Sequence, residues 1–272
     1  MHRRLAFAAV VALLLSLATL IPNSAVGQEP EKATTLRWYG QSFFQIETRG
    51  GQLIVIDPHA IPAFGTPRVS ASVVLISHEH DDHNQPEVLE DPKSARIFHG
   101  LTVSKDGRKT DWNRVDEKIL RTRVRTLGTY HDAMGGIQRG KNSIWIVEAD
   151  DLVFCHLGDL GHDLTAEQVR AIGKVDVLMV PIGGIYTING EQAKKVVEQI
   201  KPRLYVVPMH YGVPGYDDLV GPEEFLDALK NVKRTPETNE LVIPADAKAG
   251  DGPTVVLMGW RKADTVVPPK KR

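Results

Sequence analysis

The sequence predicts an α/β fold in which two β-sheets pack face to face and helices cover the outside. Two observations support this prediction. Short apolar runs rich in β-branched residues recur along the chain, as expected for buried strands. In each half of the chain, strands come first and later alternate with helical patterns. The 272 residues and the 42% hydrophobic content suit one large globular domain.

The first 27 residues have the pattern of a secretory signal peptide. Positive charge at residues 2–4 precedes an apolar stretch over 5–21, and Ala25, Val26 and Gly27 are small residues suited to cleavage. We expect export to the periplasm or the extracellular space, with an uncleaved membrane anchor as the alternative. Residues 28–34 then form a linker, residues 35–262 the folded domain, and residues 263–272 a polar tail.

The predicted elements follow in order along the chain. An antiparallel meander is expected first, and then a strand that ends at a histidine cluster. The polar stretch 101–117 is expected to be a surface loop, and two runs around residues 149–151 form a hairpin. Later strands alternate with helices that carry N-caps or one apolar face. The strands are predicted at 36–39, 42–46, 53–57, 73–77, 97–98, 124–127, 143–148, 152–156, 175–180, 203–208 and 254–257, and the helices at 86–89, from 165, 191–200 and 222–231.

Composition excludes several classes of function. The formal net charge of -1 gives no electrostatic case for a nucleic-acid partner. Cys155 is the single cysteine, so the chain has no internal disulfide and no thiolate metal site, and we expect a buried core residue. The sequence has neither a GxxxxGK[ST] phosphate loop nor a GxSxG nucleophile elbow. Nothing in it predicts the oligomeric state.

The stretch from His78 to His83 is the most informative in the chain. It places His78, His80, Asp82 and His83 directly after an apolar strand. Residues two apart on an extended backbone point to the same side, so His78 and His80 share a direction. The turn that follows can bring Asp82 and His83 near a second point. Imidazole and carboxylate groups in this arrangement favour two metal half-sites over a solvated turn.

Three more candidate ligands lie at the ends of later strands. They are His131, Asp159 within Gly158-Asp159, and His210. Each alone is a weak signal, because a lone histidine is more often structural and a Gly-Asp pair more often a turn. Their recurrence at successive strand ends is what supports a metal site.

At this point the sequence resembles the metallo-β-lactamase superfamily, and in particular the branch with the ascorbate-6-phosphate lactonase-like hydrolases. The His-x-His-x-Asp-His signature is matched at residues 78–83, and His131, Asp159 and His210 match the later motifs in order. The sequence around these residues is also similar to that of this branch, over roughly residues 36–211. The similar stretches are 130–132, 139–142, 156–159, 181–187 and 208–211. The loop 101–117 matches nothing known in the family.

The resemblance implies an αββα four-layer sandwich of two mixed sheets with helices on both outer faces. It implies one metal held by His78, His80 and His131, and a second held by Asp82, His83 and His210. Asp159 would bridge the two ions, and Asp57 would brace the histidine cluster. Two divalent ions are therefore expected, with zinc favoured by the histidine-rich set and manganese or iron compatible with it.

Other polar residues have both a functional and a structural interpretation. His156 is predicted to orient a ligand or to be structural, and His59 and His162 to reach the rim of the site or to be structural. His99 is expected on the surface. Possible substrate contacts are Arg139, Asn142, Tyr186 and Tyr211.

The predicted function is that of an exported hydrolase. A hydroxide held by two metal ions would cleave a small ester, lactone, amide or phosphoester, with Asp82 and Asp159 as catalytic residues. The expected partner is a small-molecule substrate, with no membrane unless the N-terminal segment remains. The alternatives are a di-iron oxidoreductase of the same fold and a metal-binding protein without turnover. His80 argues against the first, because flavodiiron proteins have Glu at this position of the signature.

Overall fold

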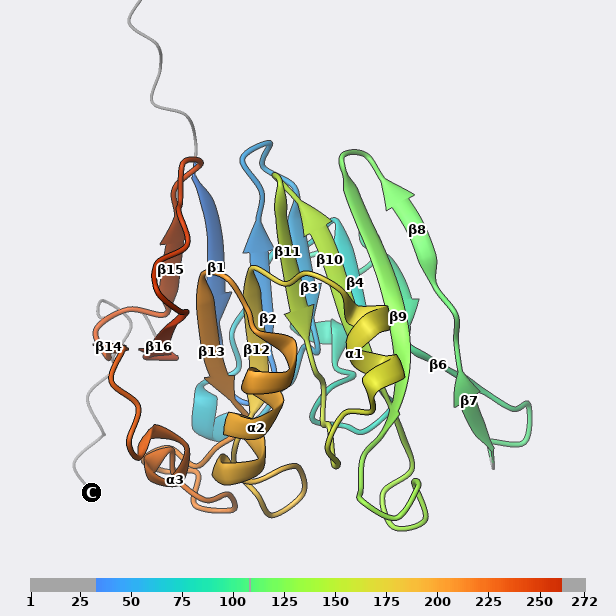
Figure 1. Ribbon diagram of the computed structural model, residues 1–272. Coiled ribbons are helices and arrows are strands. Elements are labelled where there is room, and N and C mark those ends of the chain that lie inside the picture. The colour runs from blue at the N-terminus through green and yellow to red at the C-terminus, as the bar shows by residue number, and fades with distance from the viewer. Residues whose placement is uncertain (1–32, 108, 261–272) are drawn as a thin grey trace, which may run out of the picture. The chain divides into compact units, whose positions relative to one another are not determined.

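A computed structural model describes residues 33–107 and 109–260. These residues belong to one compact unit, which spans Lys32–Arg272. The predicted signal peptide, nearly all of the predicted linker and the predicted tail 263–272 lie outside the described residues. In the described part, two large sheets stand side by side, and a small ribbon of β6 (Leu101–Val103) and β7 (Thr110–Trp112) extends from them (Figure 1).

The first sheet has six strands in the order β15-β1-β2-β3-β4-β5. The first three strands of the chain form the predicted antiparallel meander, and β4 and β5 add to it in parallel. β15 closes the other edge against β1. The strands are β1 (Thr34–Trp38), β2 (Phe44–Glu47), β3 (Leu53–Ile56), β4 (Val73–Ile76), β5 (Arg96–His99) and β15 (Glu240–Ile243).

The second sheet has eight strands in the order β14-β16-β13-β12-β11-β10-β9-β8. The predicted hairpin pairs β10 with β11, and β11, β12, β13 and β16 then run in parallel. The strands are β8 (Asp116–Ile119), β9 (Thr122–Tyr130), β10 (Lys141–Ala149), β11 (Leu152–His156), β12 (Val177–Pro181), β13 (Tyr205–Met209), β14 (Val232–Thr235) and β16 (Thr254–Met258).

Side-chain alternation on β4 shows how the layers form. Val73 and Leu75 enter the main core between the sheets, whereas Val74 and Ile76 pack in a second cluster on the outer face. Successive residues of a strand point to opposite faces, so a strand that is apolar throughout must be covered on both sides. Cys155 is buried in the main core, as predicted.

The helices α1 (Ala166–Ile172) and α2 (Gly190–Ile200) lie over the eight-stranded sheet, and α3 (Glu223–Leu226) packs beside α2 (Figure 1). Thr165 caps α1 and Asn189 caps α2, each in a capping box with a Gln three residues later. Ala193, Val196 and Ile200 form the buried face of α2. The third helix, α3, is only one turn long.

The fold class is confirmed, with three local corrections. The stretch 101–117 holds β6, β7 and the start of β8 instead of a plain loop. The helix predicted over 222–231 ends at Leu226, and the chain then enters β14. The outer face of the six-stranded sheet carries the 3-10 turn η2 (Pro86–Val88), where an α-helix was expected, and a second 3-10 turn, η1 (Pro62–Phe64), places Phe64 in the main core. Each of these turns starts at a proline, whose fixed φ suits a first turn.

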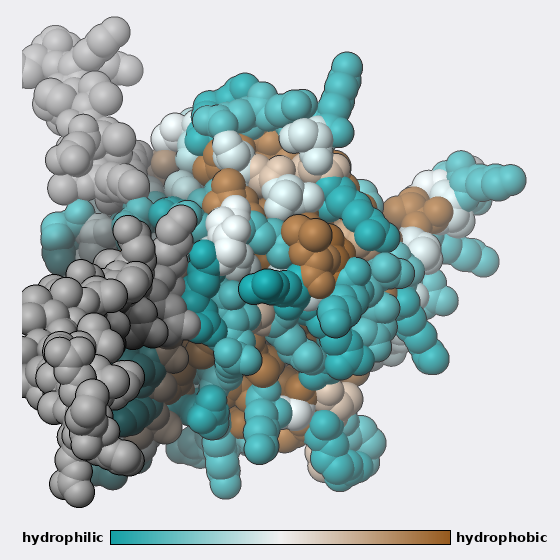
Figure 2. Space-filling view, turned by 90° about the horizontal axis from the view of Figure 1, so that it is seen from above, coloured by the Kyte–Doolittle hydropathy of each residue, from teal (hydrophilic) through white to brown (hydrophobic). Residues whose placement is uncertain are grey.

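The two ends of the sandwich carry different features. β4, β11, β12 and β13 all finish at the lower end in Figure 1, where long loops follow them. The opposite end holds tight turns between strands, and its surface is mostly hydrophilic, with apolar patches between charged side chains (Figure 2). No helix within 33–107 and 109–260 is both long and apolar enough to span a bilayer.

Candidate metal centre

The structure brings all seven predicted ligands together at the lower end of the sandwich. The residues come from the ends of β4, β9, β11 and β13, which are far apart in sequence. They form two groups, and within each group the candidate donor atoms lie within 4.8 Å of one another. The first group is His78, His80 and His131, and the second is Asp82, His83, Asp159 and His210.

One carboxylate oxygen lies at the middle of both groups. Asp159 Oδ2 is 3.0 Å from the Nε2 of His131 and 3.1 Å from the Nε2 atoms of His83 and His210. The Nε2 of His78 lies 3.8 Å away. Asp159 is only 2% exposed, so these contacts are made away from water. The predicted bridging position therefore lies between the two groups.

This arrangement fits metal ions better than hydrogen bonds alone. A carboxylate oxygen has too few lone pairs to accept from four imidazoles at once. The buried Nε2 of His83 indeed has no hydrogen-bond partner, and a buried polar atom left in that state costs about 1–3 kcal/mol. Neutral imidazoles and carboxylates that share one space are the donor set of a zinc-type site.

Asp57 orients two of the ligands through a buried network. Its Oδ2 lies 2.9 Å from His83 Nδ1 and accepts a hydrogen bond from Ser77 Oγ at 2.6 Å. Ser77 Oγ in turn lies 2.9 Å from His78 Nδ1. With the Nδ1 proton of each histidine donated into this network, both Nε2 lone pairs face the centre. The predicted bracing role of Asp57 is therefore consistent with its position.

The electrostatics of the two groups differ. Burial lowers the pKa of His78 well below its usual value and also lowers the pKa of His80. Burial opposes protonation of His83 too, but the surrounding carboxylates, first that of Asp159, raise the pKa of His83 well above its usual value. The pKa of Asp159 is correspondingly lowered by the histidines around it, against the effect of burial. The second group is thus the one that holds a proton when no ion is bound.

Hydrogen bonds to Asn142 hold the loop that carries Asp159. Asn142 Oδ1 accepts a hydrogen bond from the Asp159 backbone N–H at 3.0 Å, and its amide donates to Leu157 O at 2.9 Å. Gly158 has a φ of +54°, and a Cβ there would lie 2.3 Å from Asn142 Oδ1. Asn142 is fully buried, so the prediction that it contacts substrate is wrong, because its polar atoms are used to position Asp159.

His156 acts on the same loop through the backbone. The Gly158 N–H donates to His156 Nδ1 at 3.1 Å, so the ring proton lies on Nε2, which donates to Ser42 O at 2.9 Å. Its Nδ1 is 3.9 Å from Asp57 Oδ2, beyond hydrogen-bond range. His156 therefore ties the Asp159 loop to the residues before β2 and contacts no ligand by hydrogen bond.

Two site residues have unusual backbone conformations. Asp57 has a φ of 47° and His210 a φ of 50°, both in the left-handed region that residues other than glycine seldom adopt. Gly183 lies against His210, and a Cβ at Gly183 would be 2.2 Å from the His210 carbonyl oxygen. Such conformations cluster at functional sites, where the surrounding structure enforces them.

The other predicted substrate contacts separate into two places. Tyr186 is 45% exposed, and the Arg139 guanidinium lies 5.4 Å from the centre of its ring. Tyr211 is 4% exposed and stacks on Trp38 with ring centres 5.3 Å apart. Tyr186 and Arg139 are thus accessible, whereas the prediction for Tyr211 is not supported by its position.

The remaining histidines are structural. His59 is fully buried, with Nε2 bonded to Gly40 O at 3.0 Å, and burial lowers its pKa to about 4. His162 accepts the Tyr130 N–H at 3.1 Å and contacts Asp163 O at 2.7 Å. Neither therefore provides a free side chain at the rim of the site. His99 is partly exposed and pairs with Glu79 at 2.8 Å.

Sequence inspection missed two side chains near the centre. Gln41 Nε2 donates to Asp82 Oδ2 at 3.0 Å, and its backbone carbonyl accepts the His210 N–H at 3.1 Å. Tyr216 is the last residue of a type II turn that begins at Val213. In this turn Gly215 has a φ of +89°, and the Tyr216 N–H donates to Val213 O at 2.8 Å. The Pro-Gly pair was a usable signal for the turn, but nothing in it indicated where the phenol lies.

The phenol of Tyr216 lies within the electrostatic reach of the centre. Burial raises the pKa of Tyr216 to about 12, and the charges of Asp82 and Asp159 add to this rise. Its ring packs on Phe64, with centres 5.1 Å apart. Tyr216 is therefore a protonated phenol at neutral pH, and its pKa is influenced by the charges of two predicted ligands.

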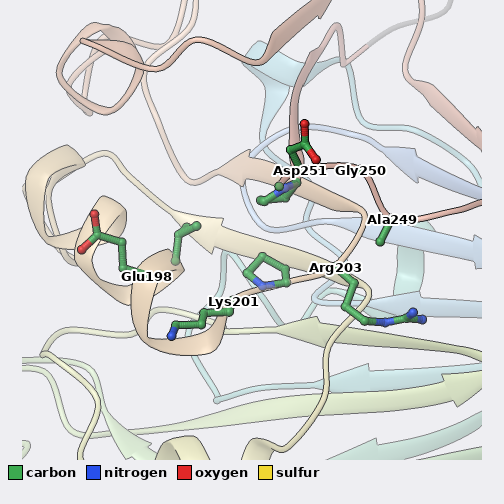
Figure 3. Close-up of a pocket in the computed structure, with 10 residues that line it drawn as sticks. Glu198, Lys201, Arg203, Ala249, Gly250 and Asp251 are labelled. Atoms are coloured by element: carbon green, nitrogen blue, oxygen red, sulfur yellow. The ribbon is translucent and has the colours of Figure 1, made fainter.

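Two cavities lie outside the ligand set. One, of about 1060 Å³, is lined by Tyr211, the 212–223 segment and residues of β14 and β16. The other, of about 500 Å³, lies between the end of α2 and residues 249–253, with Glu198, Lys201, Arg203 and Asp251 around it (Figure 3). Arg203 precedes β13 and His210 follows it, so at ~3.3 Å per residue this second cavity is roughly 20 Å from the ligands.

The fold and the ligand geometry define a class of protein, and comparison with known proteins agrees. Residues 35–210 match the sequence model of the beta-lactamase superfamily domain, and the chain belongs to this family. A UPF0173 protein of Pyrococcus furiosus is 32% identical over 206 residues, which cover 71% of this chain and 89% of the relative. A UPF0173 metal-dependent hydrolase of Nitratidesulfovibrio vulgaris is 26% identical over 66% of this chain and 80% of the relative.

Solved structures give the same result. A candidate zinc-dependent hydrolase of the metallo-β-lactamase superfamily from Thermotoga maritima is 27% identical, with a TM-score of 0.62 over 83% of this chain and 99% of that one. The diiron β-hydroxylase CmlA of Streptomyces venezuelae, at 13% identity and a TM-score of 0.50, shares the fold alone. The predicted superfamily and enzyme class, a metal-dependent hydrolase, are therefore confirmed.

Proposed function

We propose that this protein is an exported hydrolase that holds two divalent metal ions, with zinc as the favoured metal, and cleaves a small ester, lactone, amide or phosphoester. The observation that carries the proposal is the convergence of four imidazole Nε2 atoms on Asp159 Oδ2 at 3.0–3.8 Å. Five histidines with two carboxylates form a donor set that suits zinc.

The two groups of ligands define the two positions. The first would use the Nε2 atoms of His78 and His131 with Nδ1 of His80, which lies 3.1 Å from His78 Nε2. The second would use Asp82, His83 and His210, with Asp159 shared between both. When bound, two divalent ions would supply a water of lowered pKa and polarise the scissile bond.

The chain's own residues supply the remaining functions. Asp82 is partly exposed and is held by Gln41, so its carboxylate can carry a proton from the attacking water to the leaving group. Tyr216 can donate its phenol O–H to a substrate oxygen on which negative charge develops. Asp159 and Asp57 keep the ligands in place through the contacts described above.

The export part of the proposal depends on the sequence pattern of residues 1–27 alone. Mass spectrometry of the protein from the periplasm or medium should show a chain that starts at Gln28 or within a few residues of it. A chain that keeps Met1 and sediments with membranes would contradict export and favour an anchor.

Hydrolysis is tested by removing and restoring the metal. Chelator-treated protein should lose activity on a panel of aryl esters, lactones, phosphodiesters and β-lactams, and zinc should restore it on at least one class. Asp163→Ala is a matched control, because Asp163 lies four residues from Asp159 but pairs with Lys195 at the surface. Activity that survives complete metal removal would contradict the proposal.

A further inference from the structure

Apolar side chains gather at the mouth of the metal centre. Among residues 33–107 and 109–260, eight large hydrophobic side chains are exposed, and five of them lie on loops at this end. These five are Met134, Ile137, Ile185, Tyr186 and Val220. Single exposed apolar residues are common on protein surfaces, but a group beside a catalytic centre is a sign of binding. We call this group the apolar rim.

The first loop of the rim directly follows the ligand His131 and is rigidly held. The buried carboxylate of Asp132 accepts four backbone N–H bonds, from residues 134, 136, 138 and 139, at 2.7–2.9 Å. This network leaves Met134 and Ile137 pointing to solvent, 53% and 79% exposed. The exposure is therefore built into the loop and does not come from a loose segment.

The second loop lies beside the first. The Arg139 guanidinium stacks over Tyr186 and donates to Ile185 O at 3.3 Å, so the two loops are joined. The Val220 N–H donates to Gly183 O at 3.2 Å, which brings the 212–220 segment to the same place. Gly183 is also the residue packed against the carbonyl of the ligand His210. The rim is thus continuous with the metal centre.

The charge of the rim restricts what it can bind. Residues 182–189 contain no charged side chain, and Asp132 in the first loop is buried by its own hydrogen bonds. Arg139 is the one accessible charged side chain of these two loops, and no described carboxylate forms an ion pair with it. The third segment, residues 212–220, carries the exposed carboxylates Asp217 and Asp218 before Val220. An apolar group of a substrate that lies on the first two loops would cover few polar groups, so little polar hydration would be lost there.

We propose that the apolar rim binds a hydrocarbon chain or aryl group of the substrate, so that the enzyme prefers esters or amides with an apolar acyl part over short acyl groups. This inference rests on the proposed function, because the rim is assigned to the substrate of the metal centre. Each methylene fully transferred from water is worth up to about fourfold in affinity. A chain longer by six methylenes should therefore gain tenfold or more, even if it is only half covered.

Alkyl hydroxamates test the rim without turnover. Calorimetry with zinc-loaded protein should show that octanohydroxamate binds about tenfold or more tighter than acetohydroxamate. The variant Ile137→Ser should reduce that gain to less than about threefold. Leu120→Ser is the matched control, because Leu120 is also 79% exposed but lies in the turn before β9 at the opposite end; it should keep the full gain.

The outcomes separate the two proposals. Binding of both hydroxamates with equal affinity would overturn the rim and leave the metal site supported. Failure of both to bind, together with no zinc uptake, would overturn the proposed function and the rim with it. If the chain-length gain is absent but Ile137→Ser weakens binding to phosphatidylcholine vesicles, the rim contacts a lipid surface and the substrate assignment is wrong.

Discussion

The two halves of the metal centre differ mainly in charge and support. The half formed by His78, His80 and His131 consists of imidazoles only; His78 and His131 are buried, and His80 is the more exposed. The other half has two carboxylates; His83, His210 and Asp159 are almost completely buried, and Asp82 is partly exposed. His83 is held by Asp57, whose brace reaches His78 only through Ser77.

This difference suggests a division of labour. A half-site with negative charge and a braced imidazole should hold its ion firmly, because the carboxylates attract the cation and the ligands need little reorganisation. A half-site with one exposed imidazole should exchange its ion more readily and face the substrate.

Asp159→Ala should have the largest effect, because Asp159 is the one residue shared by both halves. We expect kcat/KM to fall by about 100-fold or more and metal content to fall below two ions per chain. Plasma emission analysis and kinetics on the same preparation check both. A variant that keeps two ions and nearly full activity would show that Asp159 is not the bridge.

Asp57→Asn should weaken metal binding selectively in the half that contains His83. The neutral Asn amide cannot replace the charged carboxylate that accepts the His83 Nδ1 proton. Loss of such a hydrogen bond to a ligand typically lowers metal affinity about 10–100-fold. Competition with a chelating dye measures this affinity. Asp176→Asn is the control, because Asp176 is also buried but pairs with Arg203 at the far end of β13. Equal loss of metal affinity in both variants would mean that general destabilisation, and not the brace, is responsible.

Tyr216→Phe should lower kcat by about tenfold without changing metal content, since only a hydrogen bond to the developing charge is removed. Tyr211→Phe, on a buried ring stacked against Trp38, should leave kcat near the wild-type value. Steady-state kinetics of the two variants distinguish them. A loss of activity confined to Tyr211→Phe would restore the original prediction for that residue and remove the role of Tyr216.

The pH dependence of zinc binding should reveal the difference in charge between the two halves of the centre. Because the pKa of His83 is raised in the folded state, the proton on His83 stabilises the metal-free fold fully below about pH 6.5. This stabilisation is lost as the pH rises through the raised pKa of the folded state. Zinc must displace that proton, so loading should release about one proton at neutral pH from this half and tighten as pH rises. The lowered pKa values of His78 and His80 mean that those two imidazoles are already neutral.

Calorimetry in buffers of different protonation enthalpy measures the released protons. His83→Gln should release fewer protons than the wild type, and His80→Gln the same number. An equal release from all three proteins would contradict the charge difference between the halves.

Sequence alone was sufficient for the parts of the fold with strong local signals. The apolar run of β4, the hairpin of β10 and β11, the capping box of α1 and the amphipathic pattern of α2 were all recognisable. β15 was missed because four residues carry little periodicity, and its pairing with β1 spans about two hundred positions. The helix expected over 222–231 ended early because tertiary pairing of β14 with β16 outweighed local propensity.

In the site, too, sequence was sufficient where the signal was local and insufficient where tertiary contacts decided the outcome. The seven ligands were accessible to sequence reasoning because they follow strands and fit a known pattern. The orientation of Asn142 and Tyr211 was not, because polar side chains near a motif can face inward as easily as outward. Tyr216 lies on a turn beyond the matched region 35–210, where its contacts depend on how that loop folds back.

Anomalous diffraction from zinc-soaked crystals tests the central claim most directly. We expect two peaks at the zinc edge, ~3.5–4 Å apart, with the Asp159 carboxylate in contact with both and the peak near His83 the more fully occupied. A single peak, or two peaks of which neither contacts Asp159, would contradict a dinuclear centre built around this residue.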